Sequence, residues 1–221
     1  AIYVKSAGNG FLDFGGDDGT AAYCRNANIA GLSCQNSNMD ATNATPWIIV
    51  TAALDAGGIM SSYSTGGSAN WISAPGGEYG YNSNTVGPSY VSRAFEPAII
   101  TTDQSGCCVG SAGEEVTAVN EFQNNTNELN HYCAFTSTFN GTSSAAPVVS
   151  GAIALMLEKN PNLTWREVKH ILASTARKVH SSHTGETIQI NSVSYTANLG
   201  WVTNDASYDY HNWYGFGAVD V

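Results

Sequence analysis

Residues 140–147 combine residue types that suit nucleophilic catalysis. They read Asn-Gly-Thr-Ser-Ser-Ala-Ala-Pro, and Ser143 stands at the start of a predicted helix of small apolar residues. The first turn of a helix offers free backbone N–H groups and the positive end of the helix dipole, and both stabilise negative charge. A serine held there is suited to attack a carbonyl carbon. The alternative from these residues alone is a capped, buried helix without a catalytic role.

Two apolar strands and two helices are expected to position this serine. Residues 1–7 and 46–54 are continuous apolar runs, which are typical of parallel strands covered on both faces. The helix over 143–158 is small and apolar almost all round, so it should be buried and should end near Lys159. A second helix is predicted over about 165–179, because Thr164 and Glu167 form a capping box at its start.

The other segments carry weaker signals. Residues 11–45 are rich in Gly, Asn, Asp and Ala and are predicted as loop. Residues 78–139 are polar and irregular, and the Asn/Thr/Glu-rich stretch 120–130 is the best candidate for a surface insertion, with a binding loop as the alternative. Residues 187–221 contain many aromatic residues and weak strand signals.

Composition excludes several classes of function. The 221 residues suffice for one domain with a full core. No apolar run is long enough to span a membrane. The 18 acidic and 8 basic residues give a net charge of −10, which argues against a nucleic-acid partner. The acidic surface would suit a cationic substrate, or it serves solubility alone.

The five cysteines fit no zinc pattern and indicate disulfides in an oxidising compartment. Cys24 and Cys34 bracket a short loop and are one plausible pair. Either Cys107 or Cys108 pairs with Cys133. The remaining cysteine is free or is bonded to a partner.

Several segments together resemble the subtilisin family of serine proteases. Residues 140–147, followed by a helix of small residues, are similar to the family's nucleophile motif. Residues 160–168 and 214–220 resemble the kexin and furin branch, and residues 1–10 resemble the strand and turn that carry the oxyanion-binding asparagine. The resemblance implies an α/β fold of three α/β/α layers around a mainly parallel sheet. Residues 1–221 would form the C-terminal half of that catalytic domain, with an insertion at about 104–139.

The resemblance assigns roles by position. Ser143 would be the nucleophile that forms an acyl-enzyme, and Asn9 would donate its side-chain amide to the oxyanion. Ala7 and Gly8 would belong to the substrate-binding cleft. Asp40 would place a buried carboxylate at the bottom of the S1 pocket, where it would pair with an Arg or Lys of the substrate. Without the resemblance, Asn9 reads as a turn residue and Asp40 as a turn cap.

The histidine base and its orienting aspartate lie upstream of the asparagine in this family, and neither is expected within these residues. The chain by itself is therefore predicted to be inactive, and its main partner would be an N-terminal fragment of the same protease. The leftover cysteine is a candidate link to that fragment. All five histidines are predicted to be structural or solvated: His131, His170, His180, His183 and His211.

Further expectations come from the family alone. They are secretion to the extracellular space, protein or peptide substrates, a propeptide, a P-domain and structural calcium. The furin branch holds one calcium ion beside S1 with carboxylates, but the matching positions are Gln35 and Thr65, so calcium ligands stay unassigned.

Two other functions compete with an endopeptidase. A catalytically inactive binding or scaffold module is the first, although a scaffold needs neither Asn9 nor Ser143. An esterase is disfavoured, because the sequence lacks the Gly-x-Ser-x-Gly elbow.

Overall fold

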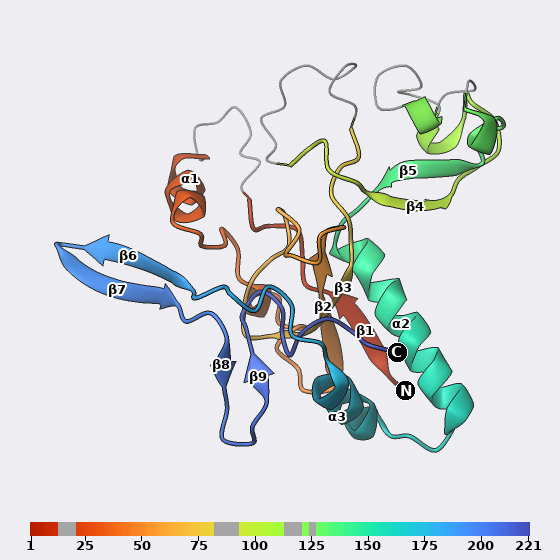
Figure 1. Cartoon of the computed structure of the whole chain (residues 1–221). Helices are drawn as coiled ribbons and strands as arrows, with labels where there is room; N and C mark the ends of the chain where they lie inside the picture. The colour runs from red at the N-terminus through yellow and green to blue at the C-terminus, as the bar shows by residue number, and fades with distance from the viewer. Residues whose placement is uncertain (13–20, 82–92, 113–120, 124–126) are drawn as a thin grey trace.

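A three-stranded parallel sheet forms the centre of the computed structural model, which describes residues 1–12, 21–81, 93–112, 121–123 and 127–221 (Figure 1). The strands follow the order β1-β2-β3, with β1 at Tyr3–Ser6, β2 at Ile48–Leu54 and β3 at Asn70–Pro75. Both predicted apolar strands are confirmed. The fold is α/β, as the sequence predicts.

Both faces of β2 are buried, which explains its uninterrupted apolar sequence. Ile49 and Ala53 point to one face and belong to the main hydrophobic core. Leu54 points to the other face, where it packs in a smaller hydrophobic cluster with Val179 and Tyr214.

Helices α2 (Thr142–Lys159) and α3 (Trp165–Thr175) cover the sheet. α2 contacts all three strands, and α3 contacts β3. The capping box of α3 is confirmed: Glu167 donates its N–H to the Thr164 hydroxyl, and the Glu167 carboxylate accepts the Thr164 N–H. None of the described helices is long and apolar enough to cross a membrane.

Two expectations about these helices are wrong. α2 is not buried all round, because Val148 and Leu155 are 41% and 58% exposed on the side that faces away from the sheet. α3 ends at Thr175 instead of about residue 179. The chain leaves the helix there because Arg177 pairs with Ala218 through two backbone hydrogen bonds of 2.9 Å. That long-range pairing overrides the local helical pattern.

The segment predicted as loop over 11–45 contains a helix, α1 (Ala21–Ile29). Its alanines favour a helix, but they stand among Gly and Asn residues that hide so short an element. A disulfide between Cys24 and Cys34 ties the helix to the chain that follows it.

The remaining strands form three antiparallel pairs, and the hairpin of β6 and β7 extends away from the rest of the molecule (Figure 1). They are β4 (Ile99–Thr102) with β5 (Phe135–Phe139), β6 (Glu186–Ile190) with β7 (Val193–Asn198), and β8 (Val202–Thr203) with β9 (Asp209–Tyr210). Short 3₁₀ helices lie at Ser37–Met39, Gly110–Ala112, Glu121–Gln123 and Glu128–Asn130.

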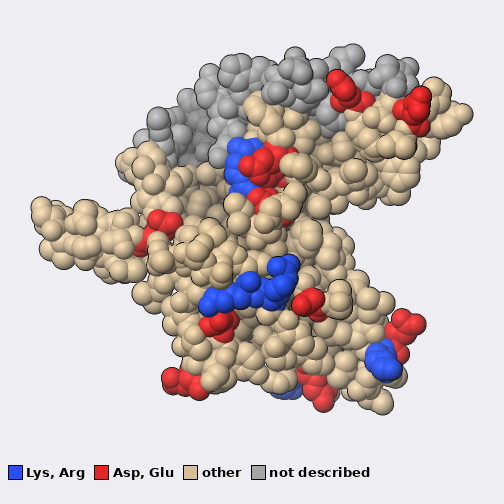
Figure 2. Space-filling view, in the orientation of Figure 1, with Lys and Arg blue, Asp and Glu red and all other residues tan. Residues whose placement is uncertain are grey.

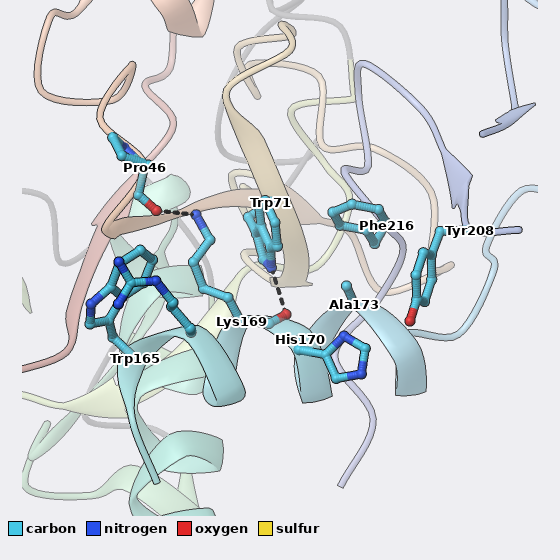
Figure 3. A pocket seen from close by; sticks show the side chains of 9 residues that line it. Pro46, Trp71, Trp165, Lys169, His170, Ala173, Tyr208 and Phe216 are labelled. Atoms are coloured by element: carbon cyan, nitrogen blue, oxygen red, sulfur yellow. Dashed lines mark hydrogen bonds between the residues drawn. The ribbon is translucent and has the colours of Figure 1, made fainter. Parts of the chain in front are cut away.

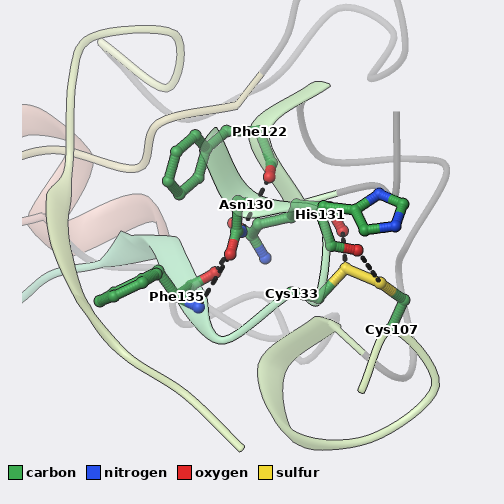
Figure 4. The surroundings of a disulfide bond; sticks show 7 residues. Cys107, Phe122, Asn130, His131, Cys133 and Phe135 are labelled. Carbon is green, nitrogen blue, oxygen red and sulfur yellow. Dashed lines mark hydrogen bonds between the residues drawn. A yellow bond between two sulfur atoms is a disulfide. The ribbon is translucent and has the colours of Figure 1, made fainter. Parts of the chain in front are cut away.

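A second disulfide joins Cys107 to Cys133 in the region predicted as an insertion (Figure 4). Beside it, the Asn130 side chain donates to the carbonyls of Phe122 (2.9 Å) and Phe135 (2.7 Å). The disulfide and this asparagine hold the turns before β5. Cys108 is the free cysteine, and it is exposed. The boundaries of the insertion stay a prediction, and part of the 120–130 stretch lies outside the described residues.

Candidate active site

Three segments meet at the carboxyl end of the sheet, where parallel α/β folds place their ligand sites. Asn9 follows β1, Gly76 follows β3, and Ser143 stands in the first turn of α2. Asn9 is hydrogen-bonded to Thr142. The Ser144 hydroxyl lies 2.9 Å from the Gly76 carbonyl oxygen. The structure therefore brings together Asn9 and Ser143, the two predicted catalytic residues.

The hydrogen bonds of Asn9 determine how its amide is oriented. Its Oδ1 accepts both the backbone N–H and the hydroxyl of Thr142, each at 2.9 Å. The same hydroxyl accepts the N–H of Gly8 (3.1 Å). Because Oδ1 is held by Thr142, the Nδ2 donor group is turned toward Gly141.

Gly141 keeps a small space open between two N–H donors. A Cβ at this position would lie 3.0 Å from Asn9 Nδ2, and 3.6 Å from both Asn9 Oδ1 and the backbone nitrogen of Ser143. The backbone at Gly141 has φ of +101°, which also favours glycine. A space flanked by two preorganised donors is the arrangement that stabilises the oxyanion of acyl transfer.

Ser143 is exposed, whereas its neighbours Thr142 and Ser144 are buried. It is the second residue of α2, so the positive end of the helix dipole acts on it. Among the residues that the structure describes, no histidine is hydrogen-bonded to Ser143. Three histidines instead gather near the C-terminus: His180, His183 and His211.

Ala7, Gly8 and Asp40, the predicted substrate-binding residues, line one pocket of about 310 Å³. Asp40 is not buried, contrary to the prediction, because its side chain is 47% exposed. It forms an ion pair with Lys5 and accepts the N–H and hydroxyl of Thr42 at 2.9 and 2.6 Å. These bonds, with Lys5 first, hold the pKa of Asp40 well below its usual value. A cationic ligand at Asp40 would have to displace Lys5.

Three carboxylates lie close enough together to be considered as a cation site. Asp55, Glu78 and Glu96 bring ligand oxygens within 4.8 Å of one another. Arg93 already pairs with all three, and the buried Glu78 also accepts the N–H and hydroxyl of Ser62. A guanidinium thus stands where a cation would bind, so these residues fit an ion-pair network and not a calcium site.

Charge is sparse on the face shown in Figure 2. Basic and acidic side chains lie next to one another there on a mostly neutral surface. On this face no large patch of one sign is seen, in keeping with the small share of charged residues, 12%.

A larger pocket of about 500 Å³ lies between β3 and α3 (Figure 3). Lys169 is buried there and donates to the carbonyls of Pro46 (2.9 Å) and Ile48 (3.0 Å), with its Nζ 3.7 Å from the centre of the Trp71 ring. Burial lowers the pKa of Lys169 to about 8. This pocket borders the amino end of β2, whereas Ser143 lies at the carboxyl end of the strands. Because Lys169 bonds the carbonyls of Pro46 and Ile48, it holds the start of β2.

Residues 141–143 at the start of α2 form the nucleophile turn. Two hydroxyl groups behind it, those of Tyr63 and Ser144, were not predicted from the sequence. Ser144 Oγ is within hydrogen-bonding distance of the carbonyls of Gly76 and Gly141. Tyr63 Oη accepts the Gly141 N–H (2.8 Å). No local sequence pattern marks the contact of Tyr63 with Gly141 or that of Ser144 with Gly76, because the partners are 78 and 68 residues apart in the chain.

Comparison with known proteins gives matches over almost the whole chain. The sequence profile of the subtilase family matches residues 1–217. The chain is 36% identical over 231 residues to the Aeromonas extracellular serine protease of Aeromonas sobria, covering 100% of the chain and 34% of that protein. It is 38% identical to human proprotein convertase subtilisin/kexin type 5 over 96 residues, which are 43% of the chain and 4% of that protein.

Solved structures agree with these matches. The crystal structure of the Aeromonas sobria serine protease superimposes with a TM-score of 0.82 at 32% identity, covering 100% of this chain and 35% of that one. The same protease in complex with the chaperone ORF2 gives a TM-score of 0.80 at 30% identity, again over 100% of this chain and 35% of the other. The chain spans about a third of the length of these relatives.

Proposed function

Because the chain belongs to the subtilase family, we propose that it supplies the nucleophile and the oxyanion-binding groups of a serine endopeptidase. Ser143 attacks the scissile carbonyl and forms an acyl-enzyme, which water then hydrolyses. Asn9 Nδ2 and the Ser143 N–H donate to the oxyanion. The observation that carries this proposal is the space between these two donors, left open because residue 141 is glycine.

The general base comes from a part of the protease outside these residues. A histidine must take the Ser143 proton and pass it to the leaving amine, and an aspartate must orient that histidine. None of the described histidines is hydrogen-bonded to Ser143, and the chain spans about a third of its relatives. In this proposal an N-terminal portion of the same protease provides both residues, and residues 1–221 alone do not cleave peptides.

Cleavage after basic residues is the specificity that we propose. Asp40, Ala7 and Gly8 line one pocket, and the carboxylate of Asp40 already binds the ammonium of Lys5. An Arg or Lys side chain of a substrate offers the same chemistry and would replace Lys5 at Asp40. This exchange loses little, because the ion pair of Lys5 and Asp40 lies between exposed side chains and is screened by solvent.

We also propose secretion, with a propeptide or a dedicated chaperone and a P-domain as further partners. The two disulfides are typical of oxidising compartments. A relative is named an extracellular protease, and its solved complex contains a chaperone. Structural calcium remains part of the proposal, without assigned ligands, because the carboxylates of Asp55, Glu78 and Glu96 are paired with Arg93.

A fluorophosphonate probe tests the assignment of the nucleophile. The full-length protease should be labelled at Ser143, as mapped by peptide mass spectrometry, and Ser143→Ala should abolish labelling. Ser150→Ala is the matched control, because Ser150 is an exposed serine of the same helix whose hydroxyl donates to the Ala146 carbonyl one turn earlier. Absence of labelling in folded wild-type protease would instead support an inactive scaffold.

A further inference from the structure

The loop between β2 and β3 is bonded to the segment that carries Asn9. The Tyr63 carbonyl accepts the N–H of Phe11 (3.0 Å). The Thr65 hydroxyl accepts the N–H of Gly10 (2.8 Å). Two of the residues that follow Asn9 are therefore anchored to this one loop.

The side chain of Tyr63 connects the same loop to the nucleophile turn. Its Oη accepts the N–H of Gly141 (2.8 Å) and donates its single proton to the carbonyl of Gly76 (2.8 Å) or Gly77 (2.7 Å). The residue is 2% exposed and belongs to the main hydrophobic core. Tyr63 thus contacts both halves of the site, through its backbone on one side and its hydroxyl on the other.

Loss of this hydroxyl would act on Gly141 first. The Gly141 N–H is buried, and a buried donor without an acceptor costs about 1–3 kcal/mol. The turn would shift to find another acceptor. Because Gly141 borders the space between Asn9 Nδ2 and the Ser143 nitrogen, such a shift changes the separation of these two donors, and small displacements of reacting groups lower rates strongly.

We propose that Tyr63 is a positioning residue, whose hydroxyl holds the two oxyanion donors at the separation that the reaction requires. The inference rests on the proposed function of Ser143. Burial raises the pKa of Tyr63 to about 12, so the hydroxyl stays protonated and the contact persists from acid to mildly alkaline pH.

The test is Tyr63→Phe in the full-length protease, which removes the hydroxyl and keeps the ring. We expect kcat to fall about tenfold, the equivalent of about 1.4 kcal/mol, with KM within about twofold. KM is spared because the hydroxyl lies behind the turn and does not contact substrate. Hydrogen–deuterium exchange at the Gly141 amide should become faster, since that amide loses its acceptor.

Tyr210→Phe is the matched control. The Tyr210 hydroxyl donates to the carbonyl of Asn70 (3.0 Å) or Gly67 (3.3 Å), at the start of β3 and away from the turn. Its loss removes the same chemical group from a comparably enclosed place. We expect kcat within twofold of wild type and unchanged exchange at Gly141, whatever the effect on thermal stability.

Fluorophosphonate labelling distinguishes failure of the proposed function from failure of the proposed role of Tyr63. It counts competent sites, so kcat is expressed per labelled site and partial unfolding does not imitate a slow enzyme. If wild-type protease is not labelled at Ser143, the proposed function fails. If it is labelled and Tyr63→Phe keeps kcat within twofold although Gly141 exchanges faster, only the role of Tyr63 is overturned. A tenfold fall shared by Tyr210→Phe overturns it as well.

Discussion

Two hydrogen-bonded clusters of this protein differ in the kind of group that holds them together. Around the nucleophile turn, amides and hydroxyls of Asn9, Thr142 and Tyr63 form the contacts. Near the C-terminus, the imidazoles of His183 and His211 make the contacts, and these residues form the second, imidazole cluster. The first cluster consists of amides and hydroxyls, which keep their protons at ordinary pH, whereas the second is built on imidazole, the side chain whose unperturbed pKa lies closest to neutral pH.

The imidazole cluster is a directed chain of hydrogen bonds. Trp213 donates its backbone N–H to Nδ1 of His211 (2.9 Å), so the neutral ring carries its proton on Nε2 and donates it to Nδ1 of His183 (3.0 Å). Nε2 of His183 then donates to the Glu186 carboxylate (3.2 Å). These tautomers are assigned from the partners of each nitrogen. An added proton on His211 Nδ1 would face the Trp213 N–H.

Burial and the neighbouring imidazoles of His183 and His180 lower the pKa of His211 to about 3. Burial of Tyr63 instead raises its pKa to about 12. Both shifts keep a buried group neutral, but only the shift of His211 falls in a range where the unfolded chain takes up a proton. The geometry of the nucleophile turn should therefore be insensitive to acid, while the C-terminal imidazole cluster should limit the stability of the protein in acid.

The largest effect on the first cluster is expected from Gly141→Ala. The new Cβ would stand 3.0 Å from Asn9 Nδ2, in the space assigned to the oxyanion. We expect kcat to fall about 100- to 1000-fold, as when an oxyanion donor is lost. Gly151→Ala is the control, because a Cβ at that helical glycine meets nothing within 4 Å. Near-normal turnover of Gly141→Ala would remove the oxyanion assignment.

Asp40→Asn tests the ion pair of Asp40 and Lys5 beside the site. Its carboxylate is the group proposed to receive a basic side chain, so kcat/KM for substrates with Arg or Lys at the cleaved bond should fall about 10- to 100-fold. Substrates with a neutral residue there should change little. Lys5→Gln removes the internal competitor of Asp40 and should favour basic substrates. A variant that keeps its preference for basic residues would falsify the role of Asp40.

The elements that position the site could be predicted because their signals are local. Apolar runs identify β1 and β2, and the capping box of Thr164 and Glu167 identifies the start of α3. Ser143 and Asn9 were found because their segments resemble a known family in the correct order. The apolar runs and the capping box lie within a few residues of the elements that they predict, whereas the family resemblance depends on the order of segments along the chain.

What the sequence did not reveal depends on partners far along the chain. The hydroxyl of Tyr63 acquires its role only when Gly141 folds against it. α3 stops at Thr175 because Arg177 pairs with Ala218. The Asp40 carboxylate pairs with Lys5 on β1, which is 35 residues away in the chain, and no local pattern marks that pair.

Lowering the pH should destabilise the folded protein through His211 of the imidazole cluster. Between pH about 6.5 and about 3, unfolded His211 binds a proton that the folded protein excludes, so stability is complete above this window and falls as the pH drops through it. Each such proton contributes a slope of about 1.4 kcal/mol per pH unit. Urea unfolding of the full-length protease between pH 7 and 4 measures it.

His211→Gln should weaken the protein at pH 7 and flatten this slope. The exposed His131 provides the control, and His131→Gln should leave the slope as in wild type. Measured at pH 7, the kcat per labelled site of His131→Gln should match that of wild type, and that of His211→Gln should match it as long as the protein remains folded. An unchanged slope in His211→Gln would mean that other groups cause the acid sensitivity.

The smallest effect is expected from Thr164→Ala, which touches neither cluster. It removes the side-chain acceptor of the α3 capping box, and loss of such a cap costs about 1 kcal/mol of unfolding free energy. This loss of unfolding free energy is similar to the cost expected when Tyr63→Phe removes one hydroxyl. Thr164→Ala and Tyr63→Phe can therefore be compared at similar stability. If the clusters are distinct as described, Thr164→Ala lowers the urea midpoint but leaves both kcat and the acid slope unchanged. A tenfold fall in kcat would show instead that turnover follows global stability, and the special role of the nucleophile turn would be lost.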